Sequence, residues 1–309
     1  MFQILHGINV DWMRRRHIAF LFSGACVLIS IVSLLVHGGP RYGVDFTGGS
    51  LVEILVTPAV HADAVRAAVD HAGYPGSEIQ ELSRPGQFLI RVESHAGRTS
   101  PAPAIQQSVV QQHPGSGVEV LRVESVGPRV GGELRGAAIK AIFFALGFIL
   151  IYVGIRYDWR YSLGAVAALF HDVFITLGAL SLMNKEITLT VVAALLTIAG
   201  YSINDTIVVF DRIRERSRTL RRETPANVMN IAINETLSRT IITSFTVFLT
   251  VLALYTLGGE VIHDFAFAML VGVVFGTYSS VYVASGLALE VQLWLERAGQ
   301  GQSQSRGKK

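Results

Sequence analysis

Charged residues are scarce in this chain. Aspartate, glutamate, lysine and arginine make up 16% of its 309 residues, whereas 50% are hydrophobic, and the mean hydropathy is +0.45. Soluble domains carry about 25% charged residues, so this composition excludes an ordinary soluble protein and indicates one that crosses a membrane several times. The formal net charge of +3 then reflects basic loops at the membrane surface and does not indicate nucleic-acid binding.

Cysteine is nearly absent, because Cys26 is the only one and lies within the first apolar run. A lone cysteine excludes an intrachain disulfide and a cysteine-based metal site. The sequence has no GxxxxGK[ST] loop, and Gly48-Gly49 lacks the GxGxxG spacing of a phosphate cradle. No set of metal ligands or of Ser, His and Asp stands out at a convincing spacing. We therefore expect a protein without ATPase activity, cofactor or metal.

Six apolar runs are long enough to span the roughly 30 Å hydrocarbon core of a bilayer. They are residues 18–36, 137–155, 161–183, 187–210, 240–257 and 265–289. The first run exceeds the about 7–15 residues of a signal-peptide core, and no Ala-x-Ala-like cleavage site follows it. We predict that it remains as an uncleaved anchor.

The segment 37–134, between the first and second runs, has the mixed polarity and frequent turns of a folded domain. Its periodicity predicts strands at 50–57, 77–83, 87–93 and 118–126 and helices at 62–72 and 102–112. The resulting order, βαββαβ, is that of the ferredoxin-like fold. The predicted fold class is therefore a multi-pass α-helical membrane protein, with six transmembrane helices and one α+β domain.

Lysine and arginine are distributed unevenly among the short loops. One side of the membrane receives Arg14 to Arg16, Arg156 and Arg160, the basic loop 211–239 and the tail 293–309, whereas the short links on the other side contain only Lys185. Because basic loops stay in the cytoplasm, residues 1–17 and 293–309 are predicted to be cytoplasmic, the latter as a disordered tail. The folded domain is predicted to lie on the outer side.

Asn204 and Asp205 interrupt the fourth apolar run. An unpaired carboxylate in hydrocarbon costs ~3 kcal/mol or several times more, so Asp205 should face protein or water. It precedes Asp211, at the cytoplasmic edge, by six residues, which at 1.5 Å per residue places it about 9 Å deep. Arg239 begins the fifth run from the same side. It is a candidate ion-pair partner, but an interfacial arginine can equally extend to the headgroups.

Two other runs carry polar residues. His171 and Asp172, near the middle of the third run, suit either a proton relay or a static pair bonded to a neighbouring helix. The fifth run has a stripe of hydroxyls at helical spacing: Thr236, Thr240, Thr243 and Thr250. Such a stripe lines a water-filled path or bonds neighbouring helices. The small residues of the sixth run, repeated every four positions from Gly272 to Ala288, predict close helix packing without chemistry.

Five motifs in the same order resemble the SecD/SecF family, which belongs to the RND superfamily. They are GVDFTGG at 43–49, VGPRVGGEL at 126–134, the HD pair at 171–172, GYSINDTIVVFDRIRE at 200–215 and TLSRTIITS at 236–244. The DFTGG form is similar to the SecF branch rather than to SecD. The signature loop, with Gly43, Asp45, Phe46, Gly48 and Gly49, is interpreted as a rigid turn between the first span and the domain.

The resemblance implies an RND-like subunit of the bacterial cytoplasmic (inner) membrane, with its domain in the periplasm. It implies SecD, YajC and the SecYEG channel as partners, an unfolded polypeptide as substrate, and protons as the coupling ion that completes protein export. In the family, the acid of GYSINDT and the arginine of TLSRT belong to the proton pathway, and they match Asp205 and Arg239. The alternative is an RND-type exporter of lipids or small molecules, which would need a ligand-sized apolar pocket.

Overall fold

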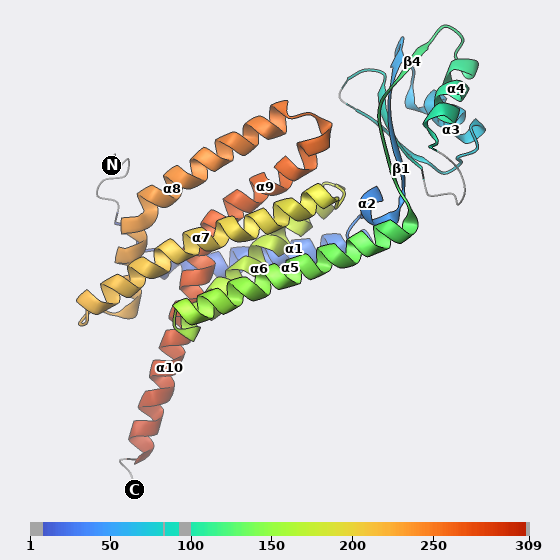
Figure 1. Ribbon diagram of the computed structural model, residues 1–309. Coiled ribbons are helices and arrows are strands. Elements are labelled where there is room, and N and C mark those ends of the chain that lie inside the picture. Colours follow the sequence, from blue (N-terminus) through green and yellow to red (C-terminus); the bar gives the residue numbers. More distant parts are fainter. Residues whose placement is uncertain (1–8, 83, 93–99, 307–309) are drawn as a thin grey trace. The chain divides into compact units, whose positions relative to one another are not determined.

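The computed structural model describes residues 9–82, 84–92 and 100–306 (Figure 1). Two compact units divide the chain. The helical unit consists of Met1–Arg41 and Ala141–Lys309, and the smaller unit of Tyr42–Lys140.

The smaller unit is built on a four-stranded antiparallel sheet. Its strands are β1 (Gly49–Thr57), β2 (Glu78–Glu81), β3 (Gln87–Val92) and β4 (Gly117–Val126), in the order β2-β3-β1-β4. Helices α3 (Ala62–His71) and α4 (Ala102–Gln112) cover one face (Figure 1). This confirms the predicted α+β fold. Ser83 and Glu93, the ends of two predicted strands, lie outside the described residues.

Alternation along the strands creates the core of this unit. Val52, Ile54 and Val56 point to one face of β1 and are at most 1% exposed, because successive strand residues face opposite sides. In β3, Phe88 pairs with Ile54 and Ile90 pairs with Val52, so the apolar faces of the two strands coincide. Together they pack against the apolar faces of α3 and α4.

The signature loop folds into a single helical turn, α2 (Val44–Thr47), with Val44 and Phe46 buried. Gly48 ends this turn with φ +74°, a left-handed value that glycine adopts without strain. A Cβ at Gly48 would lie 2.7 Å from the Cα of Pro128, at the start of α5 (Pro128–Arg156). Because Gly48 has no side chain, the backbone that leads into β1 can pass close to the backbone at Pro128, where the chain leaves β4.

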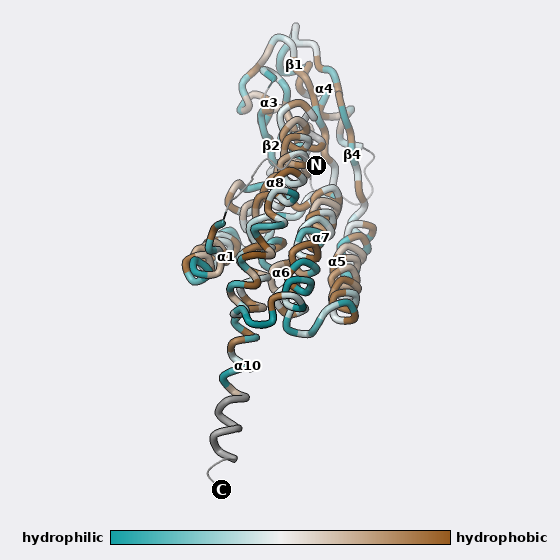
Figure 2. Tube along the Cα trace, turned by 90° about the vertical axis from the view of Figure 1, so that its left-hand side faces the viewer, coloured by the Kyte–Doolittle hydropathy of each residue, from teal (hydrophilic) through white to brown (hydrophobic). Residues whose placement is uncertain are grey.

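The described residues contain six helical stretches long and apolar enough to span a membrane, as predicted. They are α1 (Arg16–Val36) with its preceding turn η1 (Met13–Arg15), α5, α6 (Trp159–Leu182), α7 (Leu189–Thr219), α8 (Pro225–Leu257), and a last span that combines α9 (Glu260–Ser279), the π-helical turn η2 (Ser280–Ala284) and α10 (Ser285–Arg306). Figure 2 shows how hydrophobic residues dominate α5.

Two helices extend well beyond the apolar runs. Most of 211–239, predicted as a loop, is helical, because α7 continues to Thr219 and α8 begins at Pro225. The reason is that hydropathy marks the edge of the membrane, whereas a helix continues as long as its backbone is hydrogen-bonded. Here Glu235 of α8 pairs with Arg212 at 2.6 Å and with Arg216 at 2.5 Å. Likewise, α10 continues to Arg306 through a segment predicted to be a disordered tail.

The repeated small residues of the last span pack against α7, as predicted. A Cβ at Gly272 would lie 2.3 Å from a side-chain carbon of Ile198, and one at Gly276 would lie 3.2 Å from the Cβ of Ser202. Close backbone approach of this kind is the usual role of small residues between membrane helices. It places the last span where its hydroxyls can reach the acids of α6 and α7.

Candidate functional site

Asp205 lies on α7, buried among neighbouring helices. Its side chain accepts two hydrogen bonds: Thr240 Oγ1 of α8 donates to Oδ1 at 2.7 Å, and Ser280 Oγ of η2 donates to Oδ2 at 2.7 Å. The residue is 7% exposed. Hydrogen bonds to an ionised group are about twice as strong as neutral ones. Hydroxyls from two other helices therefore compensate this carboxylate within the membrane-spanning bundle.

Asp172, on α6, is fully buried at 0% exposure. His171 Nδ1 lies 2.9 Å from Oδ1, while Ser202 Oγ and Ser279 Oγ donate to Oδ2 at 2.5 and 2.6 Å. The other imidazole nitrogen, His171 Nε2, is buried and has no hydrogen-bond partner among the described residues. When Nδ1 donates to the carboxylate, Nε2 keeps a free lone pair.

The two carboxylates belong to one polar network. Ser202 lies one helical turn before Asp205 on α7 and donates to Asp172 of α6. Ser279, the last residue of α9, and Ser280, the first of η2, each donate to a different carboxylate. This network connects α6, α7, α8 and the last span, so a change in the charge of either acid acts on several helices.

The hydroxyl stripe of α8 is only partly directed at the acids. Thr240 is 2% exposed and donates to Asp205, whereas Thr236, Thr243 and Thr250 donate to carbonyls of their own helix. One turn beyond Thr240, Ser244 accepts hydrogen bonds from Tyr201 of α7 at 2.9 Å and from Thr277 of α9 at 2.7 Å. The stripe therefore contributes both a ligand for the carboxylate and bonds between helices.

Arg239 and Asn204 lie next to the residues that form the site, but both side chains are exposed. The helices α7 and α8 are neighbours, as an ion pair between Asp205 and Arg239 requires. Within the described ranges, however, the ion pairs of the structure do not include this one. Arg239 precedes Thr240, and a helix directs consecutive side chains to different faces. Thr240 therefore takes the position facing Asp205.

Sequence reasoning missed the serine donors, Ser202, Ser279 and Ser280. Ser280 belongs to the row of small residues in the sixth run, a pattern that indicated packing alone. Their role depends on the register between helices, which only the structure shows: Gly276 packs against Ser202, so the hydroxyls one turn after Gly276 come next to the acids of α6 and α7.

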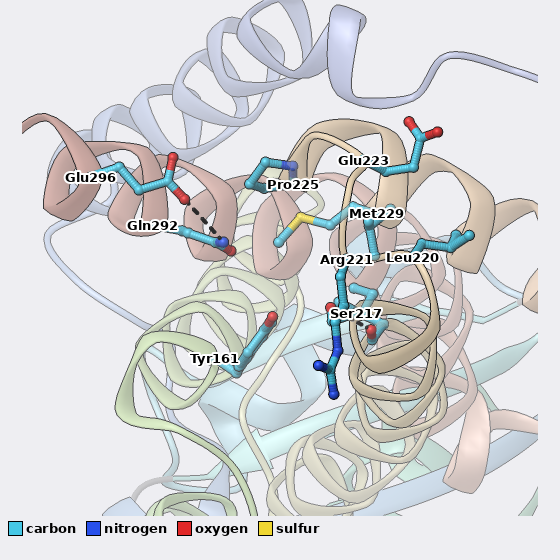
Figure 3. A pocket seen from close by; sticks show the side chains of 11 residues that line it. Tyr161, Ser217, Leu220, Arg221, Glu223, Pro225, Met229, Gln292 and Glu296 are labelled. Carbon is cyan, nitrogen blue, oxygen red and sulfur yellow. Dashed lines mark hydrogen bonds between the residues drawn. The ribbon is translucent and has the colours of Figure 1, made fainter.

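A cavity of about 280 Å³ opens at the ends of α6, α7, α8 and α10 (Figure 3). Its lining is mixed and includes Arg221, Glu223, Ser217, Gln292 and Glu296. Gln292 donates a hydrogen bond to Glu296 of the same helix. Neither carboxylate of the network, nor any of its hydroxyl donors, belongs to this lining. The cavity is therefore separate from the buried acids.

Two family models match the chain. The model of the protein export membrane protein SecD/SecF, C-terminal, matches residues 106–294, and the SecD/SecF GG motif matches residues 33–60. The second match contains the signature loop, and the first contains both buried acids.

Relatives similar to this chain are named protein translocase subunit SecF. The one from Vibrio alginolyticus is 43% identical over 300 residues, which cover 96% of this chain and 94% of the relative. The one from Escherichia coli O157:H7 is 41% identical over 308 residues, which cover 99% and 95%. The similarity thus extends over nearly the full length of both sequences.

Among solved structures, the chain is similar to the crystal structure of SecDF, a translocon-associated membrane protein from Thermus thermophilus. The TM-score is 0.84 with 36% identity over 94% of this chain, and the match spans 40% of that longer chain. A crystal structure of SecDF in a Super-membrane-facing form gives a TM-score of 0.70 with 35% identity, covering 98% of this chain and 41% of the other.

Proposed function

Because the chain belongs to the SecD/SecF family of protein export membrane proteins, we propose that it is an accessory subunit of the Sec translocase. With SecD, it uses the proton motive force to complete export of unfolded polypeptides across the cytoplasmic membrane. Protons are the coupling ion, and the subunit itself has no ATPase activity. YajC and the SecYEG channel are the other proposed partners.

The observation that carries this proposal is the hydrogen-bonded carboxylate of Asp205 between membrane helices. An acid at this depth is costly to keep, and such residues commonly mark proton pathways. Each proton that crosses the membrane releases about 2.3 kcal/mol per 100 mV of potential. Several protons supply enough free energy to drive a movement of the outer domain against a polypeptide.

The exposed polar residues of α7 and α8 support a partner within the membrane. Asn204, Arg239, Thr243 and Thr246 are exposed on helices that span the bilayer. Polar and charged side chains facing lipid are expensive, so we expect another protein surface or water to cover them. We propose that SecD covers this face and supplies the counter-charge for Arg239.

The proposed cycle begins with a proton from the outer side. Protonation of Asp205 removes its charge, so the hydroxyls of Thr240 and Ser280 no longer face an anion. The helices α7, α8 and the last span then repack, and the domain moves while it holds the emerging chain. Release of the proton to the cytoplasm restores the first arrangement.

The alternative, an exporter of lipids or small molecules, has no specific support. The cavity of Figure 3 has a mixed lining, in which charged residues such as Arg221 and Glu223 stand beside apolar ones such as Met229, whereas a lipid site is predominantly apolar.

The test is export by vesicles that contain this chain and SecD together with the rest of the translocase, including the SecYEG channel, with and without a proton gradient. Asp205→Asn keeps the size of the side chain and one acceptor oxygen but cannot bind the proton. We expect it to abolish the gradient-dependent part of export.

Asp211→Asn is the matched control, since Asp211 lies on the same helix and pairs with Arg156 at an exposed position. We expect nearly wild-type export from it. Normal gradient-dependent export by Asp205→Asn would refute the proposed function.

A further inference from the structure

We propose that Ser279 and Ser280 are positioning residues that couple proton binding at Asp205 to proton binding at the Asp172–His171 pair. The inference rests on the proposed function in treating both carboxylates as proton carriers. It adds that they act as one unit, connected through the π-helical turn η2, and that the two hydroxyls carry the coupling.

Each serine hydroxyl has two acceptors within reach. Ser280 Oγ lies 2.7 Å from Asp205 Oδ2 and 3.0 Å from the carbonyl of Thr277. Ser279 Oγ lies 2.6 Å from Asp172 Oδ2 and 3.1 Å from the carbonyl of Gly276. A hydroxyl has one hydrogen to donate and two lone pairs to accept with. Each serine can therefore donate to the carboxylate or to its own helix.

The charge of the carboxylate selects between these two arrangements. An ionised carboxylate only accepts hydrogen bonds, so the serine donates to it. When Asp205 binds a proton on Oδ2, the new O–H donates to Ser280 Oγ, and the hydrogen of Ser280 turns to the Thr277 carbonyl. No atom is lost or gained beyond the bound proton. The same exchange is available to Ser279 when Asp172 is protonated.

Ser280 begins an unusual piece of helix, and Ser279 is the residue just before it. Segment η2 is π-helical, a geometry that is rare and commonly found at functional sites. Ser279, Ser280 and Ser285 are each 0% exposed, and Ser285 Oγ donates to the carbonyl of Ser280 at 2.9 Å. Because Ser279 and Ser280 are adjacent, a shift of one side chain when its bond to a carboxylate changes is passed to the other through a single peptide unit.

His171 gives the coupled unit a second place for a proton. Its Nε2 is buried without a partner among the described residues, and its ring lies 6.2 Å from that of Tyr278. The titratable or charged side chains that the surrounding elements bring to this region are Cys26 of α1, His171 of α6, Tyr201 of α7, Arg239 of α8, Tyr278 of α9 and Tyr282 of η2. Of these titratable or charged side chains, only His171 hydrogen-bonds to either carboxylate within the described residues.

The experiment measures protonation directly. The full chain is reconstituted in phosphatidylglycerol vesicles, and the infrared C=O band of protonated carboxyl groups is followed during a pH titration. Asp172→Asn and Asp205→Asn assign the two bands. In the wild-type background, we expect Asp205→Asn to move the protonation midpoint of Asp172 by about one pH unit, a tenfold change in proton affinity.

The same measurement is then repeated in a variant that lacks both serine hydroxyls. In the Ser279→Ala/Ser280→Ala background, we expect the same Asp205→Asn change to move the midpoint of Asp172 by less than half as much. Direct repulsion between the carboxylates is present in both backgrounds, so the comparison isolates the part carried by the hydroxyls. If the double variant does not accumulate, the two single alanine variants provide the same comparison.

Ser181→Ala is the matched control, because Ser181 is also buried and its hydroxyl bonds to Ser33 at 2.8 Å, away from the acids. It should leave the shift intact. An equal shift with and without the serine hydroxyls, or an equal loss in the control, would overturn the inference. The titration needs neither a partner nor a substrate. If the export test fails, the titration can therefore still show whether the two carboxyl groups are coupled.

Discussion

Thr240 Oγ1 lies 2.7 Å from Asp205 Oδ1. The contact joins two membrane helices, α7 and α8, at a buried position, and it places a neutral donor beside the carboxylate for which Arg239 was the candidate partner. A hydroxyl holds the carboxylate without cancelling its charge. Gain and loss of a proton at Asp205 therefore change the net charge of the bundle interior.

Replacing Thr240 by valine keeps the shape of the side chain but removes this donor. Losing one hydrogen bond to a charged group costs about 1.5–3 kcal/mol, so we expect gradient-dependent export to fall by about tenfold or more. Thr236→Val is the matched control, since Thr236 is also buried on α8 but donates only to its own helix. The measurement compares gradient-dependent export by vesicles that contain Thr240→Val with export by vesicles that contain Thr236→Val. Equal losses in the two variants would show that Thr240 acts through packing alone.

Gly48 is predicted to be irreplaceable for a steric reason. In Gly48→Ala, the new methyl group would meet the backbone of Pro128, and the residue would keep φ +74°. We expect a destabilisation of about 2–5 kcal/mol, from left-handed strain and overpacking together.

Gly76→Ala isolates the strain, because Gly76 has φ +78° with nothing within 4 Å of the added carbon. We expect a loss of about 1–2 kcal/mol there. Protease resistance of the full-length chain on heating compares the two variants. Similar losses would mean that the approach of Gly48 to Pro128 is not constrained.

The orientation of the chain is predicted from its basic loops and can be tested by labelling. In a Cys26→Ser background, cysteine is introduced at exposed positions, as Gln111→Cys on α4 or Arg221→Cys between α7 and α8. A membrane-impermeant maleimide should label position 111 in spheroplasts and position 221 only after the membrane is permeabilised. The reverse pattern would invert the predicted topology and the direction of proton entry.

Much of the fold follows from local patterns. The strands and helices of the smaller unit match their predicted ranges closely, because period-2 and period-3.6 alternation directly reflects which face is buried. The six spans were also predictable, since the length of an apolar run is set by bilayer thickness. The ends of α7 and α8 were not, because the charged residues that continue these helices outside the apolar runs are stabilised by contacts such as Arg216 with Glu235.

The sequence by itself determined that acids lie inside the membrane-spanning helices, since Asp172 and Asp205 interrupt apolar runs and must be compensated. Only the tertiary structure decided what compensates them. The donors Ser202, Thr240, Ser279 and Ser280 come from several helices, and their positions depend on helix register and on the extra residue of a π-helical turn. Neither quantity is encoded in a local pattern, because both arise from how whole helices pack against each other.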